Sequence, residues 1–77
     1  MVAEPVTIVD VDRAIAEARS GRRSHVLWQR YRLAGGIDDP GCGDAPFHAG
    51  QVAVYDERLR LLRELRRLLR KAEARSA

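Results

Sequence analysis

The fold is decided by residues 44–75, which read DAPFHAGQVAVYDERLRLLRELRRLLRKAEAR. At 3.6 residues per turn, these residues sort into an apolar face and a charged face. The apolar face carries Phe47, His48, Gln51, Val52, Val54, Tyr55, Leu59, Leu61, Leu62, Leu65, Leu68, Leu69 and Ala72. The charged face carries Asp56, Glu57, Arg60, Arg63, Glu64, Arg67, Arg70 and Lys71. We therefore predict one long amphipathic helix over residues 45–74, with Asp44 as its N-cap and Pro46 in its first turn.

One alternative for this stretch contains a strand. Gly50 weakens a helix, and residues 51–55 would place Val52 and Val54 on one side of a strand in an α+β protein. We prefer the helix because the apolar stripe continues through residues 47–55 without a change of phase.

Two shorter helices are predicted ahead of the long one. The first covers residues 8–20, with Thr7 as its N-cap and Gly21 as a natural C′ residue. The second covers residues 22–34. At about 100° per residue, the face with Leu27, Trp28 and Tyr31 points away from the face with Ile8, Val11 and Ile15. A break near Gly21 would let both faces reach one core.

The clearest loop covers residues 35–44, which hold four glycines and a Pro-Gly pair. The expected fold is all-α, a small helical hairpin or three-helix arrangement in which two short helices fold against the long C-terminal helix. We treat residues 1–77 as a single small helical domain. A strand at residues 26–33 is the minority alternative there, because Trp, Tyr and Val are good strand formers.

Length and cysteine content limit the class of protein. A chain of 77 residues buries a modest core and is marginal when alone. Its one cysteine, Cys42, excludes an internal disulfide and favours a reducing compartment, so we expect a cytoplasmic protein. We expect no signal peptide, because residues 1–10 have no basic n-region. No apolar run is long enough to span a bilayer, so we expect no membrane partner.

Acidic and basic blocks alternate along the chain, whose net charge is +3. Residues 18–37 hold five arginines and no acid, and residues 56–75 hold eight basic against four acidic side chains. These blocks either pair with acidic blocks elsewhere or form a basic surface for a polyanion. For the second case, the candidate nucleic-acid-binding residues are Arg22, Arg23, Gln29, Arg30 and Arg32. A helix-turn-helix motif is disfavoured, because Glu17 and Arg22 stand where small and apolar residues are expected.

The sequence offers no constellation that would carry catalysis. His25, His48 and Cys42 are metal-capable, yet no C-x-x-C or H-x-x-x-H spacing joins such residues. The glycines of residues 35–43 form no phosphate loop, because no lysine follows them in the required pattern. We find no acid–base pair, activated nucleophile or cofactor fingerprint. We therefore predict a non-enzymatic protein with no metal, no cofactor and no small-molecule substrate.

The leucine stripe suggests a function of its own. The two short helices offer less apolar surface than the stripe demands, and an uncovered apolar surface normally marks an interface. Our leading hypothesis is an interaction or self-assembly module whose partner-binding residues are Tyr55, Leu59, Leu62, Leu65 and Leu69. One alternative is a small basic nucleic-acid-binding or regulatory protein that uses residues 19–32. Another is a small subunit of a larger ordered assembly such as a virion, where polar chain ends that usually fray would be held.

Overall fold

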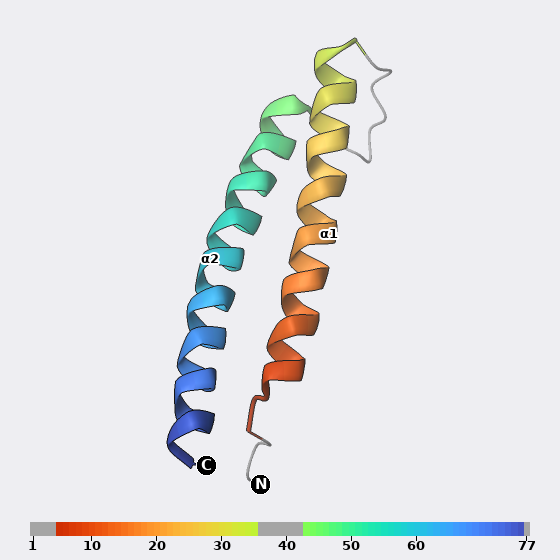
Figure 1. Ribbon diagram of the computed structural model, residues 1–77. Helices are drawn as coiled ribbons and strands as arrows, with labels where there is room; N and C mark the ends of the chain where they lie inside the picture. Colours follow the sequence, from red (N-terminus) through yellow and green to blue (C-terminus); the bar gives the residue numbers. More distant parts are fainter. Residues whose placement is uncertain (1–4, 36–42, 77) are drawn as a thin grey trace, which may run out of the picture.

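In the computed structural model, two long α-helices lie side by side and run in opposite directions (Figure 1). The structure describes residues 5–35 and 43–76; the rest of the chain, including Cys42 and most of the predicted loop, lies outside this description. Helix α1 covers Ile8–Leu33 and helix α2 covers Ala45–Ser76. Over the described residues the fold is therefore an all-α hairpin, as the sequence predicts.

Helix α1 is continuous, so the predicted break near Gly21 is wrong, and so is the three-helix arrangement. Among the described glycines, only Gly35 and Gly43 have positive φ, at 85° and 76°. Gly21 is instead a helical residue that leaves room for a neighbour. A Cβ at this position would lie 2.5 Å from Cζ of Tyr55 on α2. The glycine serves the packing of the two helices and does not end a helix.

Both strand alternatives are also wrong, since residues 26–33 and 51–55 are helical. The long helix is confirmed with nearly its predicted bounds. Asp44 caps it, because the Asp44 carboxylate accepts a hydrogen bond from the Phe47 backbone N–H at 2.9 Å. Thr7 caps α1 through its side chain, which accepts from the Asp10 backbone N–H at 3.2 Å. Local polar signals thus located both helix starts.

Among the described residues, two ion pairs join the helices at matching positions. Asp12 of α1 accepts from Arg66 of α2, with 2.6 Å between Oδ1 and Nε. Ten residues further along α1, Arg22 contacts Asp56 at 2.6 Å, and Asp56 lies ten residues before Arg66 on α2. The two helices therefore keep the same antiparallel alignment over this length.

The buried side of each helix follows an alternating spacing of three and four residues. On α1 the shielded positions of this pattern are Ile8, Val11, Ile15, Ala18, Arg22, His25, Gln29 and Arg32. On α2 they are Ala45, His48, Val52, Tyr55, Leu59, Leu62, Arg66 and Leu69. This seven-residue repeat is the spacing that brings two helices together in a coiled coil. We call these sixteen residues the seam.

The seam is apolar near the start of α1 and polar near the loop end. Among the described residues the fully buried core is small: Val11 and Ala18, each 2% exposed, Leu59, 5% exposed, and His48, 2% exposed. So thin a core makes a hairpin marginal when it stands alone. In the described ranges, neither helix has an apolar segment long enough to cross a lipid bilayer.

Candidate functional site

Helix α2 carries a row of exposed apolar side chains beside the seam, which we call the α2 stripe. Its members and their exposed fractions are Phe47 (48%), Val54 (48%), Leu61 (54%), Leu65 (38%) and Leu68 (50%). Residues 47, 54, 61 and 68 recur every seven positions, and residue 65 lies between the last two on the same side of the helix. The stripe thus repeats with the seven-residue spacing of the seam, but its side chains stay about half-exposed.

Aromatic side chains extend the stripe at its loop end. Trp28 stacks on His48, with ring centroids 6.1 Å apart and an interplanar angle of 13°. Phe47 meets the same imidazole edge-on at 5.2 Å, and Tyr31 meets Trp28 edge-on at 5.8 Å. Trp28 and Tyr31 are 36% and 46% exposed. Thus one buried imidazole connects the stripe on α2 with two half-exposed aromatic residues on α1.

Two histidines hold the helices together at this end. Nδ1 of His25 and Nδ1 of His48 are 2.8 Å apart, so one nitrogen donates the hydrogen bond and the other accepts it. Nε2 of His48 is buried and has no hydrogen-bond partner within the described residues. This pair could not be predicted from the sequence, because neither histidine belongs to a short motif.

The predicted partner-binding residues fall on two different surfaces. Tyr55, Leu59, Leu62 and Leu69 lie in the seam, where α1 shields them. Leu65 alone of that set belongs to the α2 stripe. Leu61 and Leu68 were assigned to the same broad apolar face, but not to the binding surface. The available signal was the presence of two adjacent leucine rows, only one of which α1 can cover.

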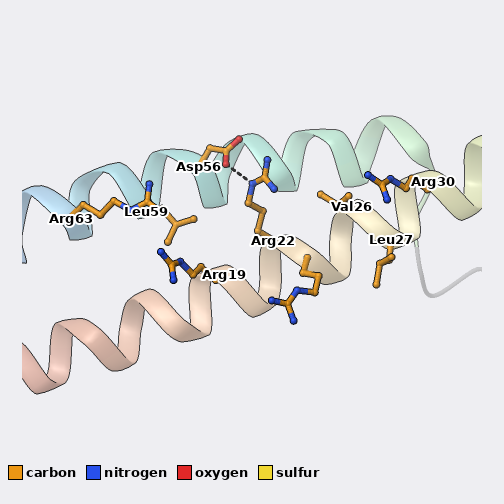
Figure 2. Close-up of a pocket in the computed structure, with 9 residues that line it drawn as sticks. Arg19, Arg22, Val26, Leu27, Arg30, Asp56, Leu59 and Arg63 are labelled. Atoms are coloured by element: carbon orange, nitrogen blue, oxygen red, sulfur yellow. Dashed lines mark hydrogen bonds and ion pairs between the residues drawn. The ribbon is translucent and has the colours of Figure 1, made fainter.

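A second surface is rich in arginine and lies between the helices on another side of the hairpin (Figure 2). This arginine groove has a volume of about 600 Å³ and is lined by Arg19, Arg22, Arg23, Val26, Leu27, Arg30, Asp56, Leu59 and Arg63. A smaller hollow of about 360 Å³ shares Arg19 and Arg63 with it and adds Arg66 and Asp12. The basic surface therefore continues along the hairpin.

The predicted nucleic-acid-binding residues also fall on two different surfaces, the arginine groove and the seam. Arg22, Arg23 and Arg30 line the arginine groove. Gln29 and Arg32 are half-buried seam residues, and the Arg32 guanidinium lies 5.6 Å from the centre of the Trp28 ring. Arg19 and Arg63 also line the groove but are not among the five predicted residues. The sequence pattern places Arg63 on the charged face of the long helix.

The groove and the stripe occupy opposite sides of α2. At about 100° of rotation per residue, the groove side of α2 points roughly 170° away from its stripe. The groove side here means residues 56, 59 and 63, and the stripe means residues 54, 61 and 68. The same rotation places Trp28 nearly opposite the groove residues of α1. The hairpin therefore presents an apolar surface and a basic surface that a single flat ligand cannot contact together.

Elsewhere on α2, arginines are paired within their own helix. Arg60 donates to Glu57, with 3.0 Å between Nε and Oε2, and Arg67 pairs with Glu64 in the same way. These hydrogen bonds hold the pKa values of the Glu57 and Glu64 carboxyls below their ordinary range. Both pairs connect residues three apart on one exposed surface, where such contacts contribute little to stability.

Within the part of the chain that the structure describes, no group of three or more His, Cys, Asp or Glu side chains is placed to hold a metal ion. Comparison with protein-family models, with curated proteins and with solved structures found no match to this chain. The α2 stripe and the arginine groove are therefore the candidate functional surfaces of the described residues.

Proposed function

We propose that this protein is a non-enzymatic helical module that assembles with a second copy of itself through the α2 stripe. The observation that carries the proposal is the row of five apolar side chains, each between 38% and 54% exposed, along one line of α2. Exposed apolar rows of this kind are typical of interfaces.

A second α2 helix fits the stripe by its spacing. Surfaces that repeat every seven residues pair with helices that have the same repeat. In an antiparallel pairing centred on Leu61, Val54 of each copy comes level with Leu68 of the other. Such twofold, self-complementary contacts are the commonest way in which identical chains assemble.

The small core of the hairpin supports the same proposal. Pairing two hairpins through the stripe would produce a four-helix assembly in which each α2 helix has apolar neighbours on two sides. Burying the exposed half of a leucine contributes on the order of 1 kcal/mol, so three leucines from each copy provide a substantial driving force.

The test is the molar mass in solution, measured by light scattering on a size-exclusion column at low and high salt. We expect a dimer or larger assembly that resists salt in the wild-type protein. Replacing Leu61 and Leu68 by glutamine should yield a helical monomer. The matched control replaces Val9 and Leu33, which are 65% and 71% exposed and lie on α1, by glutamine and should leave the assembly intact.

A wild-type monomer at about 100 μM would contradict the proposal, because interfaces of this type should be populated there. An assembly that survives the Leu61→Gln/Leu68→Gln change would also contradict it. In that case the stripe would be solvent-exposed in the assembled protein as well.

A further inference from the structure

We propose that the arginine groove binds the phosphate backbone of a nucleic acid without reading its sequence. This inference is independent of self-assembly, because the groove and the α2 stripe lie on opposite sides of α2. Its basis is a set of groove arginines that form no ion pair or hydrogen bond within the described residues.

Four arginines of the groove have no ion-pair or hydrogen-bond partner among the described residues: Arg19, Arg23, Arg30 and Arg63. The fifth, Arg22, is paired with Asp56, and in the adjoining hollow Arg66 is paired with Asp12. The carboxylates of Asp56 and Asp12 thus neutralise two arginines, and four further arginines lie beside them without a counter-charge. Their mutual repulsion is a cost that a polyanion would remove.

The type of side chain indicates the ligand. A guanidinium group is planar, remains charged and matches two phosphate oxygens at once. Every basic residue in the groove is arginine, and these arginines come from both helices. A ligand in the groove would thus be held from two sides.

The length of the basic row favours a polymer over a single phosphate. Arg19, Arg23 and Arg30 lie on one side of α1, and the first and last are separated by about 16 Å at 1.5 Å per residue. Arg63 lies across the groove on α2 (Figure 2). One phosphate group cannot contact all of these side chains, whereas a strand with regularly spaced phosphates can.

Other polyanions fit the structure less well. A lipid bilayer presents a flat surface, whereas these arginines line a groove between two helices, which a strand can enter. Arginine clusters also recognise acidic peptides. A nucleic acid is favoured because its phosphates are regularly spaced along the whole row of arginines. Trp28 faces away from the groove, and the residues that line it include no aromatic side chain to stack on bases. Contact with the backbone alone implies little sequence preference.

The proposal predicts how steeply the binding constant falls as the salt concentration rises. If the four unpartnered arginines each neutralise one phosphate, the logarithm of the binding constant should fall with the logarithm of salt concentration with a slope of about −3.6 for duplex DNA and about −2.8 for a single strand. The slope counts phosphate contacts and is insensitive to how tightly the apolar surface binds anything else.

The experiment measures fluorescence anisotropy of two unrelated labelled 20-nucleotide DNAs, each single-stranded and duplex, between 50 and 300 mM salt. The test variant is Arg19→Gln/Arg23→Gln/Arg63→Gln. At 100 mM salt we expect it to bind about a hundredfold more weakly than the wild type, with a slope smaller by about 2 to 3. The matched control, Arg13→Gln/Lys71→Gln/Arg75→Gln, changes the net charge equally outside the groove and should retain most of the affinity. Circular dichroism checks that each variant is as helical as the wild type.

Several results would overturn the proposal. Absence of binding at 50 mM salt would remove it, and an equal loss in the control variant would attribute binding to net charge alone. A preference above tenfold between the two DNA sequences would contradict recognition of the backbone. Tighter binding to phosphatidylserine vesicles, or to polyglutamate, than to either DNA would assign the groove to a membrane surface or to an acidic polypeptide.

Discussion

Gly21 of α1 lies against the ring of Tyr55 of α2, so closely that a Cβ on residue 21 would be 2.5 Å from Cζ and 2.6 Å from the hydroxyl oxygen. The ring in turn lies 5.7 Å from the imidazole of His25, and the Arg58 guanidinium lies 5.0 Å from its centre. The absence of a side chain at residue 21 therefore lets an aromatic residue enter the helix pair at its middle.

The first prediction compares the two glycines that lie inside helices. Gly50 has open space where a Cβ would be. Gly50→Ala should raise the free energy of unfolding by about 0.5–1 kcal/mol, because alanine is the better helix former. Gly21→Ala should instead lower it by about 1 kcal/mol, because the Tyr55 ring must leave its place and lose its packing. Urea denaturation of both variants measures the difference.

A third variant separates packing from helix propensity. In a Tyr55→Ala background, Gly21→Ala should change from destabilising to stabilising, since the clashing ring is gone. If Gly21→Ala stabilises the wild-type chain as much as Gly50→Ala does, then the close approach of Tyr55 has no energetic consequence.

The second prediction separates the seam from the α2 stripe. Leu59 is 5% exposed and Leu61 is 54% exposed, although they are two residues apart. At a protein concentration low enough to hold the chain as a monomer, Leu59→Ala should cost about 2–3 kcal/mol of unfolding free energy. Leu61→Ala should then cost less than about 0.5 kcal/mol.

Raising the protein concentration should change this ranking. If assembly occurs through the stripe, the wild type gains stability with concentration and Leu61→Ala gains less. Thermal melts at 5 and 500 μM measure this gain. Equal gains for both proteins would show that Leu61 lies outside any contact between copies.

The third prediction concerns the histidine pair, which should respond unequally to substitution. His25→Leu would leave both ring nitrogens of the buried His48 without a partner, at a cost of about 1–3 kcal/mol. His48→Leu would leave His25, which is half-buried and can turn its ring toward water, and should cost less. The double variant should be more stable than His25→Leu alone, because no buried polar atom of the pair remains. Thermal denaturation ranks the three proteins, and the reverse order for the single variants would contradict this account.

The fourth prediction concerns acid and the start of α1. Hydrogen bonds from the Thr7 backbone N–H, at 3.0 Å, and from the Thr7 hydroxyl hold the pKa of the Asp10 carboxyl below its ordinary value of 3.8. A depressed pKa contributes stability that is present above the unfolded value and is lost as the pH falls through the folded value. Asp10→Asn should therefore lower helicity at pH 6 and lose its effect near pH 2.

Circular dichroism of the wild type and Asp10→Asn, followed from pH 6 to pH 2, checks this expectation. Glu57 and Glu64 titrate in both proteins, so their contributions cancel in the difference. Thr7→Val removes the other half of the same cap, so its effect should not add fully to that of Asp10→Asn. A difference between wild type and Asp10→Asn that persists unchanged at pH 2 would show that the carboxylate is not responsible.

The candidate surfaces could be predicted from the sequence only in part. Leu65, Arg22, Arg23 and Arg30 were identified as interaction residues, and the structure places them on the stripe or in the groove. Near the loop end, hydrophobicity was a misleading guide to the seam. The apolar Leu27 and the aromatic Trp28 point outward, while Arg22, His25, Gln29 and Arg32 continue the spacing that begins at Ile8.

The amino-acid sequence by itself determined the local features of this protein. These are the long second helix, the cap of each helix, and the glycine that follows α1, because each depends on side chains within a few residues of one another. The tertiary structure alone decided which leucine row faces α1, why residue 21 is a glycine, and that Arg63 lines the same groove as Arg19 and Arg23. Each of these depends on the alignment of two helices whose contacting residues lie far apart in the sequence. No periodicity within one helix encodes that alignment; the packing of the pair sets it.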